Sequence, residues 1–301
     1  MRNRSGMSRA LVRRETTAGY LFLLPSLFFF LTFVIYPMFM CIYTSFFDSN
    51  MGKDAAMTFV WLDNYKELFQ DQVFLGALKN TVIIVLVSVP TVCAFSLWVA
   101  TAIYDMKPAL TSVFRVIFYL PVVTGSVAVT VVWKWMYNNY YGIFNYLLKG
   151  AGAIDQNINW LGDERYALWC IIIILFTTSV GQPIVLYVSA LNNVDHSLVE
   201  AAEVDGAKHS QVFWKIKWAQ IMPTTLYILV ITTINSFQCF ALIQLLTSGG
   251  PNHSTDTVMY YIYYTAFKLY RYGYGNAMGV VLMIIIAIMS AVQFKLGQSK
   301  D

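Results

Sequence analysis

The sequence carries few charges and lacks the patterns that mark soluble enzymes. Only 12% of its 301 residues are charged, whereas soluble domains carry about 25%. The small net charge of +4 does not suggest nucleic-acid binding. The four cysteines form no CxxC pair and the three histidines have no ligand spacing, which argues against a disulfide framework or a metal site. We interpret the cysteines as small apolar packing residues.

Hydrophobic residues, in contrast, make up 58% of the chain and gather in long runs. A helix needs about 20 apolar residues to cross a hydrocarbon core. Backbone groups in lipid must bond within their own segment, so runs of this length predict helices. The runs do not alternate between apolar and polar residues, which argues against a β-barrel. We expect six spans, within residues 16–47, 81–104, 116–133, 166–194, 224–246 and 272–294.

Basic residues are distributed unevenly between the two sets of connecting segments. The N-terminus, segments 105–115 and 195–217, and the C-terminus carry most Lys and Arg residues, whereas the other segments hold more acids than bases. The more positive side faces the cytoplasm. Both termini and segment 195–217 are therefore predicted to be cytoplasmic. The basic N-terminus is interpreted as a retained anchor, because the apolar run after it is too long for a signal peptide.

The stretch from Ser197 to Pro223 is polar and compact, and it lies between two apolar runs. Ser197 and Glu200 fit an S-x-x-E capping box, and Gly206 is a helix stop, so we expect a short helix. A second helix is expected to start at His209 or Ser210 and to lie on the membrane surface, with Pro223 at the entry to the fifth span. On these features alone, a connector without a special role is an equal alternative.

The same stretch resembles the cytoplasmic signature of the inner-membrane permease subunits of bacterial ABC importers. That signature runs EAA, three residues, G, and later a hydrophobic-Leu-Pro. Here it reads Glu200-Ala201-Ala202 and Asp205-Gly206-Ala207, but Trp218-Ala219 stand where the family has Leu-Pro. The departure bears on the break of the second helix rather than on the partner contact.

Further segments along nearly the whole chain resemble the carbohydrate branch of that family, related to the maltose and glycerol-phosphate permeases. They are AGYLFLLPSL (18–27), LDNYKELF (62–69), ALKNT (77–81), FYLPVV (118–123), WKWMYN (133–138), NWLGD (159–163), SFQCFALI (236–243) and GGPNHSTDT (249–257).

The resemblance implies an all-α membrane protein with six transmembrane helices and the transmembrane domain of a type I ABC importer. It implies an N-terminal part, 1–76, with the basic tail, the first transmembrane helix and an outer loop. The importer transmembrane domain would cover 77–296, and 297–301 would be a tail. A cytoplasmic coupling helix would contact the ATPase through Ser197, Glu200, Ala201, Ala202, Asp205, Gly206 and Ala207.

The resemblance also implies the partners and the location. They are a second homologous permease, a dimer of ATP-binding subunits, an extracytoplasmic solute-binding protein and the lipid bilayer of the bacterial cytoplasmic (inner) membrane. The chain would be no enzyme and would hold no cofactor, since ATP and Mg would be bound by the partner ATPase. In agreement, it has no GxxxxGK[ST] motif.

Polar side chains inside a span are costly, and they mark either a transport pathway or helix packing. Both interpretations stay open for the candidate pathway residues. Asn235 and Gln238 are three residues apart and so share a helix face. Neutral amides and aromatics suit sugars. Lys134 is the only cation expected near a span interior, which favours a neutral oligosaccharide and leaves anionic saccharides as an alternative. The candidates are Trp133, Gln182, Tyr187, Asn235, Gln238 and Gln244.

We therefore expect a permease subunit of an ATP-driven, binding-protein-dependent importer that moves a sugar or oligosaccharide by alternating access. The alternative is a secondary carrier or channel not driven by ATP. Carriers commonly show internal repeats and midspan charges, neither of which is visible in the sequence. A membrane scaffold that transports nothing is the third hypothesis.

Overall fold

The computed structural model describes residues 9–49 and 57–298, and these are almost entirely helical. Residues 1–8 of the predicted basic anchor and the end of the predicted C-terminal tail lie outside the described residues. Within them, five helical stretches are long and apolar enough to cross a membrane, and a bent pair of helices can supply a sixth. The expected all-α membrane fold is confirmed.

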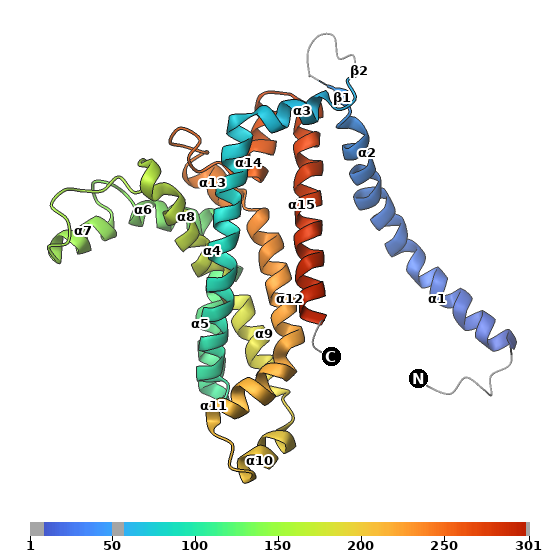
Figure 1. Cartoon of the computed structure of the whole chain (residues 1–301), viewed down its shortest axis with the longest axis vertical. Coiled ribbons are helices and arrows are strands. Elements are labelled where there is room, and N and C mark those ends of the chain that lie inside the picture. Colours follow the sequence, from blue (N-terminus) through green and yellow to red (C-terminus); the bar gives the residue numbers. More distant parts are fainter. Residues whose placement is uncertain (1–8, 50–56, 299–301) are drawn as a thin grey trace.

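Each expected span has a helical counterpart, and short elements connect them (Figure 1). The expected boundary between residues 76 and 77 falls inside the second span. The spans are α1 (Arg9–Phe30) with η1 (Leu31–Ile35) and α2 (Tyr36–Thr44); α4 (Gln72–Ile103); α5 (Pro108–Val123) with α6 (Ser126–Met136); α8 (Glu164–Ser179) with α9 (Gly181–Asn192); α11 (His209–Val212) with η2 (Phe213–Lys217), α12 (Trp218–Phe237) and α13 (Ala241–Leu246); and α15 (Tyr272–Gln298). The connectors are β1 (Phe47–Asp48), β2 (Thr58–Phe59), α3 (Asp63–Gln70), α7 (Ile143–Gly150), α10 (His196–Val204), α14 (Val258–Tyr263) and η3 (Tyr264–Lys268).

The third span is not one helix over 116–133, and that expectation is wrong. Its two parts, α5 and α6, meet at an angle of 94°. Pro121 cannot donate a hydrogen bond to the carbonyl of Ile117 one turn earlier, which weakens the end of α5. Thr124 and Gly125 then adopt extended conformations, so the chain turns before α6 begins.

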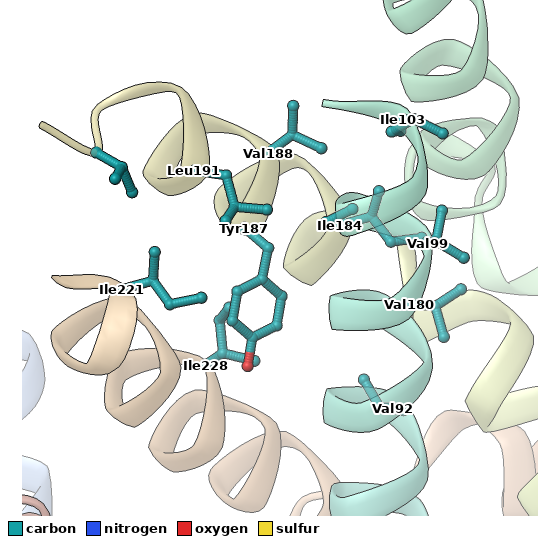
Figure 2. Close-up of a cluster of buried hydrophobic side chains, with 12 residues drawn as sticks. Val92, Val99, Ile103, Val180, Ile184, Tyr187, Val188, Leu191, Ile221 and Ile228 are labelled. Atoms are coloured by element: carbon teal, nitrogen blue, oxygen red, sulfur yellow. The ribbon is translucent and has the colours of Figure 1, made fainter. Parts of the chain in front are cut away.

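The bundle is built around α4, α9 and α12, with α5 packed on α9 and α15 packed on α12. Helices α5 and α9 approach closely at Gly181, where an added Cβ would lie 2.3 Å from the carbonyl oxygen of Phe118. Any larger residue would therefore push α5 away from α9. Figure 2 shows the apolar side chains that fill the space between the three central helices; they include Val92, Val99, Ile184, Tyr187, Ile221 and Ile228.

The first span leans away from this bundle (Figure 1). None of the residues in its most apolar window, within Thr16–Thr44, is buried. Only its outer end, α2, packs against α15. Most of its apolar surface is therefore left for lipid or for another protein chain.

A partly buried set of hydrogen bonds around Asp71 joins three helices at one end of the bundle. This residue caps α4, and its Oδ1 accepts hydrogen bonds from the backbone N–H groups of Val73 and Phe74. Its Oδ2 accepts from the hydroxyls of Tyr261, at 2.7 Å, and Tyr274, at 2.9 Å. One carboxylate thus joins the start of α4 to α14 and α15.

Candidate coupling helix and translocation cavity

The short helix α10 lies at one end of the bundle and connects α9 to α11 (Figure 1). The charge distribution predicts that this end faces the cytoplasm. The N-cap of α10 is Asp195, whose Oδ1 accepts from the backbone N–H of Ser197 at 2.9 Å and from its hydroxyl at 2.7 Å. The predicted capping box on Ser197 is therefore wrong. Asp195 is an equally good cap and already has an extended backbone, so the helix starts earlier. The Ser197 bonds hold the pKa of the Asp195 carboxyl below its usual value.

The end of α10 is the predicted one. Gly206 has a φ of +80°, a left-handed conformation that favours glycine. The backbone N–H of Gly206 bonds to the carbonyl of Glu203, and that of Ala207 bonds to the carbonyl of Ala202. These two bonds form a Schellman motif, which satisfies carbonyls that the helix end would leave without partners.

No side chain of α10 is buried. Leu198 and Val204 are exposed to 51% and 88%, and Ala201 lies exposed on the same helix. Leu198, Ala201 and Val204 are spaced three residues apart, so they share one face. The helix thus offers a narrow apolar stripe with acids beside it, at Glu200 and Glu203.

The expected second helix, starting at His209 or Ser210, is not separate from the fifth span. Elements α11, η2 and α12 follow one another without a gap, and the residues at both junctions have helical backbone angles. The sequence offers the reason. Trp218-Ala219 allow the helix to continue where a proline would interrupt it, and Pro223 is accommodated inside α12.

A cavity of about 150 Å³ lies where α5, α9 and α12 meet the junction of α8 and α9. It brings together two of the predicted pathway residues, Gln182 and Asn235. Three hydroxyl side chains, Thr178, Ser179 and Thr232, line it as well. All five polar groups are uncharged, so the cavity offers donors and acceptors without a fixed charge.

The other predicted pathway residues lie elsewhere. Gln238 is the C-cap of α12, and both Gln238 and Asn235 are exposed. Gln244 lies on α13, and its amide oxygen is buried without a hydrogen-bond partner in the part of the chain that the structure describes. Trp133 stacks against Tyr137 and Phe144 within an aromatic cluster. Tyr187 points into the hydrophobic cluster of α9 and α12 and does not line the cavity (Figure 2).

A larger cavity of about 530 Å³ adjoins the first, and Gln182 lines both. Its other walls come from α5 and α9 and are mostly apolar, with Tyr119 and Arg115 as exceptions. The Nε atom of Arg115 is buried and has no hydrogen-bond partner among the described residues. Lys134 is therefore not the only cation near a span interior. The sequence places Arg115 at the edge of an apolar run, but α5 begins earlier, at Pro108, and so carries it inside the span.

Comparison with known proteins supports the same picture. A family model described as the binding-protein-dependent transport system inner membrane component matches residues 20–299. The chain belongs to this family of transport permeases. It is 33% identical to the probable ABC transporter permease protein YesP of Bacillus subtilis (strain 168), over 94% of this chain and 91% of that protein.

Other relatives of the permease agree in length and fold. The multiple sugar-binding transport system permease protein MsmF of Streptococcus mutans is 31% identical, over 93% of this chain and 95% of that protein. The fold matches a chain from the crystal structure of a bacterial ABC transporter involved in the import of the acidic polysaccharide alginate. The TM-score is 0.82 at 23% identity, covering 97% of this chain and 99% of that one. The expected function, as a permease subunit of a binding-protein-dependent transport system, is confirmed.

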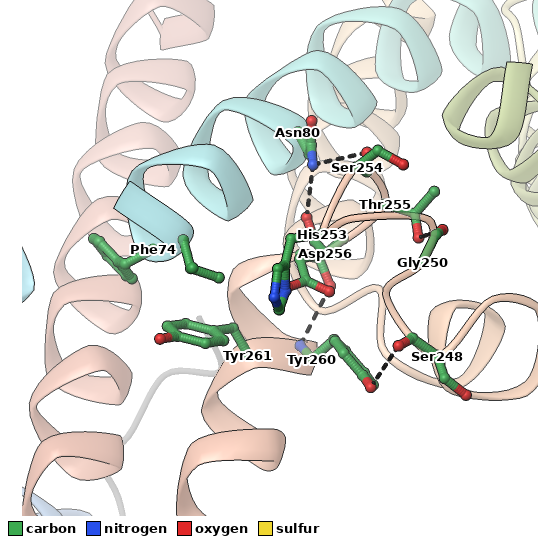
Figure 3. A network of polar contacts seen from close by, with 12 residues as sticks. Phe74, Asn80, Ser248, Gly250, His253, Ser254, Thr255, Asp256, Tyr260 and Tyr261 are labelled. Carbon is green, nitrogen blue, oxygen red and sulfur yellow. Dashed lines mark hydrogen bonds and ion pairs between the residues drawn. The ribbon is translucent and has the colours of Figure 1, made fainter. Parts of the chain in front are cut away.

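The loop between α13 and α14 lies at the end of the bundle opposite α10 and is bonded to α4 (Figure 3). Asn80 of α4 donates to the carbonyls of Ser254 and Asp256, at 3.0 and 3.1 Å. His253 Nδ1 lies 2.6 Å from Asp256 Oδ2, and the Asp256 side chain is only 1% exposed. Burial raises the pKa of the Asp256 carboxyl, although the bond to His253 opposes the shift. The sequence motif GGPNHSTDT is therefore a folded loop that is bonded to α4 at Asn80.

Proposed function

We propose that this permease moves a sugar or oligosaccharide across the bacterial cytoplasmic membrane by alternating access, driven by ATP hydrolysis in partner subunits. The observation that carries the proposal is the cavity at Gln182 and Asn235, whose polar lining is entirely hydroxyl and amide. Saccharides present many hydroxyl donors and acceptors together with apolar ring faces, and such groups pair well with this lining. The names of the streptococcal relative and of the alginate transporter support the same substrate class.

The coupling site in this proposal is α10 with its C-terminal turn. No other part of the described chain covers its apolar stripe. At Ala201 and Ala202 the small side chains leave the helix backbone accessible. A groove in an ATP-binding subunit can approach such a helix closely. The contact residues are Ser197, Glu200, Ala201, Ala202, Asp205, Gly206 and Ala207. The permease itself performs no catalysis, and the partner binds ATP and Mg.

Two further partners belong to the proposal. A second, homologous permease would cover the apolar surface of α1 and close the open side of the cavity, where Asn235 and Gln238 are exposed. Polar groups that face lipid in midspan would be costly, so a protein partner or a water-filled path is the reasonable neighbour. An extracytoplasmic solute-binding protein would deliver the substrate to the outer face. Both termini would then be cytoplasmic.

Arg115 bears on which substrate charges the pathway can accept. Its guanidinium adds one positive charge to the larger cavity, next to Gln182. The pathway is therefore compatible with saccharides that carry an anionic group as well as with neutral ones.

Reconstitution tests the proposal. The complete importer, with both permeases and its ATP-binding subunits, is placed in lipid vesicles, and ATP hydrolysis is measured with the binding protein and a panel of neutral and acidic oligosaccharides. We expect hydrolysis to rise only when the binding protein and a matching saccharide are both present. Uptake that continues when the ATP-binding subunits are absent would contradict the proposal and favour a secondary carrier.

A further inference from the structure

The continuous helix of α11, η2 and α12 follows α10 in the chain. Two of its side chains, which the family signature does not specify, make long-range contacts. Where that signature has Leu-Pro, this chain has Trp218-Ala219, and the helix continues from η2 into α12. Because no proline breaks the helix, a displacement of α10 can be transmitted to the span through the continuous helix of α11, η2 and α12. The two contacts lie on either side of this junction, at Lys217 and Gln220.

The first contact joins η2 to α4. Lys217 Nζ donates a hydrogen bond to the hydroxyl of Tyr104 at 2.5 Å, and the same ammonium lies 4.9 Å from the centre of the Tyr104 ring. Tyr104 is the C-cap of α4. A hydrogen bond from a charged donor is stronger than a neutral one. Lys217 therefore fixes the cytoplasmic end of α4 to the start of α12.

The second contact joins α12 to the start of α10. Gln220 Oε1 accepts a hydrogen bond from the backbone N–H of Asp195 at 2.9 Å. Asp195 is the residue whose carboxylate caps α10. A side chain of α12 thus holds the residue that sets where α10 begins.

These contacts matter because α10 has little else to hold it. None of its side chains is buried, and Val199 is the member of α10 that packs against the central hydrophobic cluster. A helix with so few buried contacts would pivot locally when it is pushed. The bond from Gln220 at the start of α10 and the bond from Lys217 after its end transmit a displacement of α10 to α4 and α12.

We infer that Lys217 and Gln220 are positioning residues that carry the movement of α10 into α4 and α12. The inference rests on the proposed docking of an ATP-binding subunit on α10. Neither residue needs to touch ATP or the substrate. Each acts by keeping α10 in a fixed orientation relative to the span that lines the cavity.

The test measures an ATP-dependent change at the cavity in the intact importer, in lipid nanodiscs. Asn235 is replaced by cysteine in a background without the four native cysteines, and its labelling by a membrane-impermeant maleimide is compared with and without ATP, with EDTA present to prevent hydrolysis. The perturbing variants are Lys217→Met, Tyr104→Phe and Gln220→Leu. The conservative variants are Lys217→Arg and Gln220→Glu, which keep a cationic donor and an acceptor.

We expect the ATP-dependent change in labelling rate to fall about five- to tenfold in the perturbing variants, the scale of one lost hydrogen bond to a charged or structured group. The Lys217→Met, Tyr104→Phe double variant should be no worse than either single variant, because the two residues share one interaction. Lys217→Arg and Gln220→Glu should restore most of the response. The ATP-binding subunits should co-purify with every variant.

Lys215 supplies the matched control. It lies two residues before Lys217 on η2, is exposed, and makes no hydrogen bond or ion pair within the described part of the chain. Lys215→Met removes the same charge and should leave the response unchanged. An equal loss in Lys215→Met, an unchanged response in Lys217→Met and Gln220→Leu, or loss of the ATP-binding subunits from these variants would overturn the inference. A parent importer that shows no response to ATP would overturn the proposed function itself.

Discussion

Gly206 allows a sharp test of how α10 is built. Its φ of +80° is unfavourable for any residue with a Cβ, and the cost of that conformation is about 1–2 kcal/mol. An added Cβ would meet no atom within 4 Å, so the whole cost is conformational and none is steric. Gly206→Ala should therefore open the Schellman turn and redirect the chain at Ala207. If docking requires the Schellman turn at the end of α10, the affinity for the ATP-binding subunit falls by about five- to thirtyfold.

The assay is binding of the purified ATP-binding subunit to the permease pair in nanodiscs. Gly206→Asn is the matched control, because asparagine enters the left-handed region more readily than alanine. Its affinity should lie between those of the glycine and alanine forms. Equal loss in both variants would mean that the partner excludes any side chain there, and an unchanged affinity for Gly206→Ala would mean that the turn is not required. Either result would refute the conformational reasoning.

Three further changes have defined outcomes. Asn235→Leu removes an amide from the cavity and should slow saccharide uptake by about tenfold, measured as initial rate, while the importer stays assembled. Asn80→Asp removes the donor to two loop carbonyls and should destabilise the permease by about 1–3 kcal/mol in thermal unfolding, whereas Lys79→Met, at an exposed site, should not. The raised pKa of Asp256 means that the native state binds this proton more readily than the unfolded state does. The free energy of unfolding should therefore fall as pH rises from 3.8 through the raised pKa. Asp256→Asn should abolish this fall. A slope that persists in Asp256→Asn would assign it to another group.

The apolar runs predict the spans well because lipid leaves a long uncharged segment few alternatives to a helix. They do not predict the bend of the third span. Pro121 is visible in the sequence, but several spans contain a proline and stay continuous, as α12 does around Pro223. Whether a proline breaks a helix depends on what packs beside it. Here α5 is held against α9 at Gly181, and the chain turns three residues after Pro121.

The start of α10 shows a similar limit. Asp195 and Ser197 are both good N-caps, and the choice between them depends on where α9 ends. Gln220 also contributes, by accepting from the Asp195 N–H. This contact spans 25 residues of sequence and leaves no local pattern. The end of α10 was predictable because only glycine enters its backbone conformation at little cost.

The cavity was predictable in part. Asn235 and Gln238 share a face because they are three residues apart, and Gln182 joins Asn235 through packing that periodicity alone does not reveal. Tyr187 comes five residues after Gln182, which turns it well away around a helix with 3.6 residues per turn. Nothing in the sequence indicated that the hydroxyls of Thr178 and Thr232 line the cavity. Threonines in helices commonly bond to their own helix, as Thr178 does to the carbonyl of Ile174 at 3.0 Å.

Uptake by the reconstituted importer tests the central claim most directly. Vesicles containing the two permeases and the ATP-binding subunits receive the binding protein outside, loaded with the saccharide it retains, and accumulation is followed with and without ATP inside. We predict accumulation only with ATP, and its loss in a Gln182→Leu, Asn235→Leu variant whose ATP-binding subunits remain attached. Accumulation without ATP, or undiminished accumulation in that variant, would contradict the account.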